Sequence, residues 1–80
     1  MTASGPLIID ARRLLCPLPV IELARAARSA PPGTTLTVLV TDPAARHDVP
    51  AWARLRGHDL LGVVQPPDED TLAITVRTNG

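Results

Sequence analysis

Alternating apolar residues mark the strands of a predicted sheet. Residues 35–41 alternate most regularly, with leucine or valine at every second position and mostly threonine between them. Such alternation is typical of a strand with one face on the core and the other towards solvent. Residues 72–77 show the same alternation, while 7–9 and 58–65 are rich in leucine, isoleucine and valine. The pattern predicts four strands, and the threonine face of the second should be the wetter one.

The third predicted strand, at residues 58–65, is followed by a short polar turn. Strict alternation would place Leu61 and Val63 on one face of this strand and Leu60 and Val64 on the other. The turn is too short for a crossover connection, so we expect the last two strands to pair antiparallel.

A helical repeat separates the first two predicted strands. In residues 19–30, apolar side chains recur at the i, i+3, i+4 and i+7 positions that share one face of a helix. They are Val20, Leu23, Ala24 and Ala27. A Pro-Pro-Gly sequence follows and predicts the end of this helix.

A second helix is expected at about residues 49–56. Pro50 makes one unbroken helix from 43 to 56 doubtful, because proline lacks a backbone donor and clashes with the preceding turn. We therefore predict a loose opening turn, in which Asp42 accepts hydrogen bonds from the N–H groups that follow. Asp48 should lie near the helix N-cap, and the glycine after residue 56 should end the helix.

The predicted element order is βαβαββ, which indicates an α/β (α+β) two-layer sandwich. A strand–helix–strand crossover is right-handed and gives parallel pairing within one sheet, whereas the final hairpin is antiparallel. The result is a four-stranded mixed sheet with both helices on one face. We expect one domain at 7–77, with a flexible N-terminal tail at 1–6 and a C-terminal tail at 78–80 that frays.

The single cysteine, Cys16, lies in a Cys-Pro-Leu-Pro sequence between the first strand and the first helix. Proline is favoured in the first turn of a helix, and the residue before a proline prefers extended geometry. We therefore expect Cys16 and Leu18 to be extended. Pro19 should be the first helical residue, with Pro17 as a stiff lead-in. The alternative is a helix that starts at Pro17, which would put Leu18 in a conformation that a residue before proline disfavours. The sulfur should lie within one turn of a helix N-terminus.

This position predicts a reactive thiol. Unpaired N–H groups and the helix dipole favour an anion at a helix N-terminus, where the pKa of cysteine falls below about 8.5. Arg12 and Arg13 lie just upstream and favour the thiolate as well. The alternative is a small buried hydrophobic residue without reactivity. The two prolines favour the reactive interpretation, because an exposed sulfur held in place needs a stiff backbone.

Composition limits the kinds of partner. The 80 residues contain eight arginines, no lysine and eight acidic residues, so the formal charge is zero. Nucleic-acid and membrane-surface binders normally carry a basic excess, so we expect neither partner. No apolar stretch approaches the roughly 18 residues of a membrane span. One cysteine cannot form an internal disulfide, which favours a cytoplasmic protein.

Metal ions and cofactors are not expected. His47 and His58 are eleven residues apart and have no cysteine or histidine at ligand spacing. No glycine-rich phosphate loop and no Ser/His/Asp set is apparent. We expect His47 to be a solvated loop residue rather than a proton relay for the thiol. Trp52 should anchor the core rather than stack on a ligand.

Several segments resemble the TusA/SirA-like sulfur-carrier family. Residues 7–12 and 14–19, which include the Cys-Pro-x-Pro motif, resemble its opening signature. Residues 41–44, 48–52 and 57–58 resemble its later segments in order and spacing. The resemblance implies a fold like the C-terminal domain of translation initiation factor 3.

The resemblance also implies a function. In this family the motif cysteine, Cys16 here, takes sulfane sulfur as a persulfide and passes it to a partner protein. A cysteine desulfurase or rhodanese-type donor, a downstream acceptor protein and no cofactor are implied, with Pro17 and Pro19 supporting the motif. Family branches serve tRNA thiolation, molybdenum-cofactor biosynthesis or sulfur oxidation. Arg13 departs from the family pattern, which usually has glycine there. We expect a monomer.

A second function remains open at this point. Cys16 could belong to a non-catalytic interaction or regulatory module, as a redox sensor or a structural thiol. A sensor that ends as a disulfide usually has a resolving cysteine, and this chain has none. The proline-flanked thiol without a resolving cysteine favours the sulfur carrier.

Overall fold

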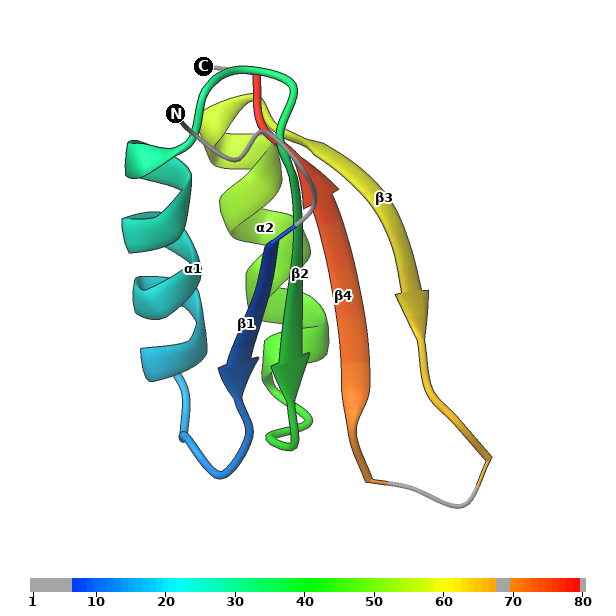
Figure 1. Ribbon diagram of the computed structural model, residues 1–80. Coiled ribbons are helices and arrows are strands. Elements are labelled where there is room, and N and C mark those ends of the chain that lie inside the picture. The colour runs from blue at the N-terminus through cyan, green and yellow to red at the C-terminus, as the bar shows by residue number, and fades with distance from the viewer. Residues whose placement is uncertain (1–6, 68–69, 80) are drawn as a thin grey trace.

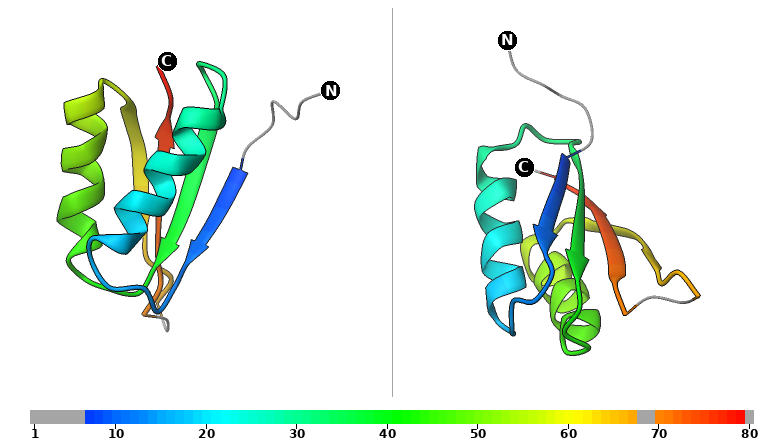
Figure 2. Two further views of the ribbon diagram at one scale, coloured as in Figure 1. Left: turned by 90° about the vertical axis from the view of Figure 1, so that its left-hand side faces the viewer. Right: turned by 60° about the horizontal axis from the view of Figure 1, so that its bottom comes forward.

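The computed structural model describes residues 7–67 and 70–79, which form a sheet with two helices on one face (Figures 1 and 2). In chain order the elements are β1 (Leu7–Ala11), α1 (Leu18–Ser29), β2 (Thr35–Val40), α2 (Ala45–Arg56), β3 (Asp59–Val64) and β4 (Leu72–Arg77). The predicted order and the two-layer arrangement are confirmed. The tail predicted at 1–6 lies outside the described residues. No helix in the described part of the chain is long and apolar enough to cross a membrane.

The strands lie in the order β1-β2-β4-β3. β1 pairs parallel with β2, from Leu7 opposite Leu36 to Ala11 opposite Val40. β4 pairs antiparallel with both β2 and β3, so the predicted mixed sheet and its final hairpin are confirmed. Because β1 and β2 are parallel, the loops that follow them leave the same edge of the sheet (Figure 1).

The core lies between the sheet and the two helices. Every second residue of the central strands β2 and β4 is buried there, together with one residue of β1, two of α1 and three of α2. These residues are Leu36, Val38, Val40, Leu72, Ile74, Val76, Ala11, Pro19, Leu23, Ala45, Val49 and Ala53. Burying each leucine, isoleucine or valine contributes about 1.5–3 kcal/mol. On the face without helices, Thr37 and Thr75 are hydrogen-bonded through their hydroxyl groups at 2.9 Å. This half-buried threonine face agrees with the prediction from alternation.

Helix α1 begins one residue earlier than predicted, at Leu18. The N–H of Leu18 donates to the carbonyl oxygen of Leu15 at 2.8 Å, and the N–H of Ile21 donates to that of Pro17 at 3.1 Å. The expectation that Leu18 is extended is therefore wrong, because these hydrogen bonds outweigh the local preference of a residue before proline. Pro19 is fully buried in the first turn, so it serves the core as well as the loop before it.

Helix α2 is continuous from Ala45 to Arg56 with Pro50 inside it, so the predicted later start is wrong. The N–H of Ala44, the N-cap residue, donates to the Asp42 carboxylate at 3.0 Å, as expected for Asp42. Buried Val49 and its neighbours of the same face then pack on the sheet. This burial offsets the backbone hydrogen bond that proline removes.

Strand β3 contains a bulge that the alternation does not reveal. Leu60 is opposite Val76 but Gly62 is opposite Thr75, so Leu61 is the extra residue. A bulge shifts the side chains beyond it to the other face. Leu60 and Val63 are opposite the core residues Val76 and Ile74, whereas Val64 is opposite Ala73. The predicted grouping of Leu60 with Val64 on one face is therefore wrong.

Thr78 and Asn79 are held rather than frayed, and the last residue of the predicted tail lies outside the described residues. Thr78 is buried, and its N–H donates to the carbonyl oxygen of Thr34 at 2.9 Å. Its hydroxyl accepts the N–H of Thr34 at 3.1 Å and donates to the carbonyl oxygen of Pro31 at 2.9 Å. The next N–H, of Asn79, donates to Nδ1 of His58 at 3.1 Å. The expectation of fraying from Thr78 is wrong because these bonds tie the end of β4 to the loop before β2.

We predict that Thr78→Val lowers the free energy of unfolding by about 1–2 kcal/mol, because valine keeps the shape but loses both hydroxyl hydrogen bonds in a buried place. Thr35→Val is the matched control on β2, where the threonine is half-buried and the change should stay within about 0.5 kcal/mol. Urea denaturation of both variants makes the measurement. Equal effects at the two sites would show that the Thr78 hydroxyl does not hold the chain end.

Candidate functional site

Cys16 is exposed at the edge of the sheet where β1 and β2 end. It directly precedes Pro17, the N-cap residue of α1, and the Cys16-Pro17 peptide bond is cis. The loop 12–17 and the loop 41–44 lie at the same end of the molecule (Figure 1). The thiol is therefore accessible, as a reactive cysteine requires, and is not part of the core.

Asp42 joins the two loops that surround the cysteine. One oxygen of its carboxylate accepts the N–H of Cys16 at 2.8 Å, and the other accepts the N–H of Ala44 at 3.0 Å. The pKa of Asp42 is lowered by the N–H of Cys16 first and by that of Ala44 second, since both stabilise the charged form. The ionised carboxylate thus holds the backbone of the cysteine against the start of α2.

Asp48 contacts the sulfur itself. This residue lies in the first turn of α2, and the Cys16 thiol donates a hydrogen bond to its Oδ2. The contact raises the pKa of the Cys16 thiol; partial desolvation and the negative charges of Asp48 and Asp42 raise it further. The expectation of a lowered thiol pKa is therefore wrong, because a carboxylate beside the sulfur disfavours the thiolate more than the helix N-terminus favours it.

The two arginines do not act on the thiol as predicted. The Arg12 guanidinium forms an ion pair with Asp10 at 2.7 Å and lowers the pKa of that carboxyl to about 2. Neither Arg12 nor Arg13 is among the groups that shift the pKa of Cys16. The charged groups that shift the pKa of the thiol are therefore carboxylates and not arginines.

Arg13 shapes the loop through its backbone. Its φ is +72°, in the left-handed region that favours glycine, and its N–H donates to the hydroxyl of Thr41 at 2.9 Å. Glycine would adopt this conformation without steric cost. Here the arginine adopts the same turn at a cost of about 1–2 kcal/mol.

Exposed apolar residues lie on both sides of Cys16 in the chain. Leu15 is 71% exposed, Leu18 46% and Ile21 43%, and all three flank Cys16 in the sequence of the loop and the first turns of α1. His47 is exposed as expected, although it lies in the first turn of α2 and not in a loop. The described residues contain no group of three or more His, Cys, Asp or Glu side chains that could hold a metal ion.

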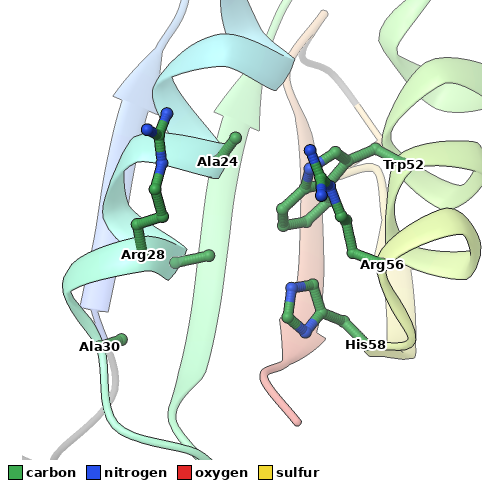
Figure 3. A pocket seen from close by; sticks show the side chains of 7 residues that line it. Ala24, Arg28, Ala30, Trp52, Arg56 and His58 are labelled. Carbon is green, nitrogen blue, oxygen red and sulfur yellow. The ribbon is translucent and has the colours of Figure 1, made fainter. Parts of the chain in front are cut away.

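A separate groove lies between the C-terminal halves of α1 and α2 (Figure 3). It has a volume of about 640 Å³ and is lined by Arg28, Arg56, Trp52 and His58. Three alanines complete the lining: two belong to α1, and the third is its C-cap residue. The Trp52 and His58 rings are 5.0 Å apart. Trp52 packs against the core, as predicted, and also borders this groove. Cys16, before the N-terminus of α1, lies at the other end of the helix.

The fold and the exposed thiol at its first strand-to-helix loop define a small α/β thiol protein, and comparison with known proteins identifies its family. A family model described as "Sulfurtransferase TusA" matches residues 7–78. The chain belongs to the TusA family.

Relatives agree with this assignment. The sulfur carrier protein TusA of Pseudomonas aeruginosa is 43% identical over 61 residues, which cover 76% of this chain and 77% of the relative. That of Pseudomonas syringae pv. syringae is 38% identical over 69 residues, covering 86% and 80%. The crystal structure of a SirA-like protein from Desulfitobacterium hafniense superposes with a TM-score of 0.79 at 27% identity, covering 92% of this chain and 99% of that one.

We predict that the alkylation rate of Cys16 by iodoacetamide rises with pH to a midpoint above that of free cysteine, about 8.5, because the Asp48 carboxylate raises the thiol pKa. Arg12→Gln should leave this midpoint unchanged while raising the pKa of Asp10 from about 2 towards 3.8. Alkylation followed by mass spectrometry and a carboxyl NMR titration make the two measurements. A midpoint below that of free cysteine would restore the lowered-pKa interpretation.

We also predict that Arg13→Gly stabilises the protein by about 0.5–1 kcal/mol. Glycine removes the left-handed strain, and its larger freedom in the unfolded chain offsets part of the gain. Arg13→Ala keeps a Cβ in the same backbone conformation and should not stabilise. Thermal unfolding of both variants separates backbone strain from the loss of the charge. An equal gain in the two variants would assign the effect to the side chain.

Proposed function

We propose that this protein is a sulfur carrier that holds sulfane sulfur as a persulfide on Cys16. The observation that carries the proposal is the single exposed thiol, anchored through its backbone N–H by Asp42. A carrier needs a nucleophilic sulfur that a partner protein can reach, with no metal and no second cysteine. The sulfur carriers among the relatives support this function.

The reaction is an exchange of sulfur between thiols. The Cys16 thiolate attacks the outer sulfur of a donor persulfide, the donor's S–S bond breaks, and the donor sulfur leaves as a thiolate. Cys16 then presents its own outer sulfur to a thiolate or other nucleophile of the acceptor, and leaves as the thiolate that began the cycle. Each step keeps the number of sulfane sulfurs and electrons constant, so no oxidant or reductant is consumed.

Two protein partners follow from this chemistry. A cysteine desulfurase or a rhodanese-type protein would supply the persulfide, and a downstream acceptor protein would remove it. We place the carrier in the cytoplasm, where a thiol without a partner cysteine stays reduced. We expect it to act as a monomer. Pro17 and Pro19 would support the motif by limiting the motion of the loop around the sulfur.

We predict that Cys16→Ser abolishes transfer of ³⁵S from a cysteine-fed desulfurase, because a hydroxyl group cannot form a persulfide. The free energy of unfolding should change by no more than about 0.5 kcal/mol, as expected at an exposed position. Radiolabel transfer and urea denaturation on the same preparation make the measurements, with Ser29→Ala as an exposed control.

Intact mass of the wild-type protein, purified without reductant, separates the two candidate functions. One extra sulfur atom that dithiothreitol removes supports the carrier. A wild type that takes up no label, but forms sulfenic acid or a mixed disulfide with peroxide, would replace the carrier by a redox sensor.

A further inference from the structure

Two carboxylates act on Cys16, and both disfavour its thiolate. Asp48 accepts the hydrogen bond of the thiol, and Asp42 accepts the N–H of the same residue. Arg12 pairs with Asp10, and neither Arg13 nor Arg46 is among the groups that shift the pKa of the thiol. On α1, Glu22 pairs with Arg25. The charged groups that shift the pKa of the thiol are therefore both negative.

This arrangement conflicts with the transfer step, which needs a thiolate. A carboxylate in hydrogen-bond contact holds the proton on sulfur. A partner that covers the apolar rim of Leu15, Leu18 and Ile21 would exclude water and strengthen the repulsion between a thiolate and the carboxylate. Docking by an uncharged apolar surface would thus make the cysteine less reactive at the moment of transfer. A partner that activates it has to contribute positive charge.

We propose that Asp48 keeps Cys16 protonated between transfers, and that the sulfur donor activates the thiol by presenting a cationic side chain to the Asp42–Asp48 pair within an apolar contact. The proposal rests on the proposed function for the identity of the donor. In this proposal Asp48 holds the thiol proton and selects the partner. The surface of the partner that covers Leu15, Leu18 and Ile21 combines apolar groups with a lysine or arginine.

The activated step balances without a further reagent. The partner's cation replaces the thiol as the neighbour of the Asp48 carboxylate, and the thiol proton passes to solvent. The Cys16 thiolate then forms a bond to the outer sulfur of the donor persulfide. The S–S bond of the donor breaks, its electron pair remains on the donor sulfur, and that thiolate takes up a proton from solvent.

Charged thiosulfonates test this arrangement without any protein donor. The Cys16 thiolate attacks the sulfenyl sulfur of a methanethiosulfonate, forms a mixed disulfide and expels methanesulfinate, so the attack resembles the one on a persulfide. The probes are the cationic trimethylammonium-ethyl and the anionic sulfonatoethyl methanethiosulfonates. Their rate ratio at fixed pH and low salt reports the charge that faces the sulfur.

We predict that the ratio of cationic to anionic rates falls about fivefold or more in Asp48→Asn, since the amide keeps the size of the carboxylate but removes its charge. Glu22→Gln is the matched control on α1, an acid-to-amide change on a residue that does not shift the thiol, and its ratio should stay within about twofold of the wild type. Asp42→Asn should give an intermediate decrease, because that carboxylate acts on the sulfur through charge alone.

A second measurement on the same variants separates the proton from the charge. With neutral iodoacetamide, the midpoint of the rate against pH should move to lower pH in Asp48→Asn and stay in place in Glu22→Gln. An Asp48→Asn variant that folds, with the wild-type rate ratio and midpoint, would overturn the proposal. These reagents need no biological donor. A wild type that fails to take up ³⁵S would remove the proposed function and leave this result standing.

Discussion

The Asp42 carboxylate is the interaction on which the geometry of the site depends. Parallel pairing of β1 and β2 brings the loops after both strands to one edge of the sheet, and Asp42 joins them through the N–H groups of Cys16 and Ala44. The same residue lies in the loop just before α2, and the first turn of α2 carries Asp48 to the sulfur. One ionised side chain therefore positions the thiol and its neighbouring carboxylate together.

The acidic surroundings give an exposed cysteine a way to be both accessible and stable. Alkylation and oxidation proceed through the thiolate, so a raised thiol pKa protects the sulfur between encounters. A buried cysteine would also be protected, but a partner could not reach it. Charge, unlike burial, can be reversed by a docking protein within the time of one encounter. This property suits a carrier that meets a donor and an acceptor in turn.

Two local preferences of the chain yield to tertiary contacts. Pro50 lies inside α2, because the burial of Val49 and Ala53 holds that helix on the sheet. Arg13 occupies a left-handed turn, because the loop from β1 has to reach both Thr41 and Asp42. In each case several contacts from distant parts of the chain outweigh a backbone cost of a few kcal/mol at most.

The sequence by itself determined the element order, the two-layer class, the position of Cys16 before α1 and the membership in a sulfur-carrier family, because these depend on periodicity, turn residues and a short motif. Only the tertiary structure decided the length of α2, the bulge at Leu61 and the surroundings of the thiol. Asp48 lies 32 positions from Cys16, and no local pattern links them. The charge that acts on a side chain depends on its neighbours in space, so the pKa of Cys16 followed from the fold and not from the adjacent arginines.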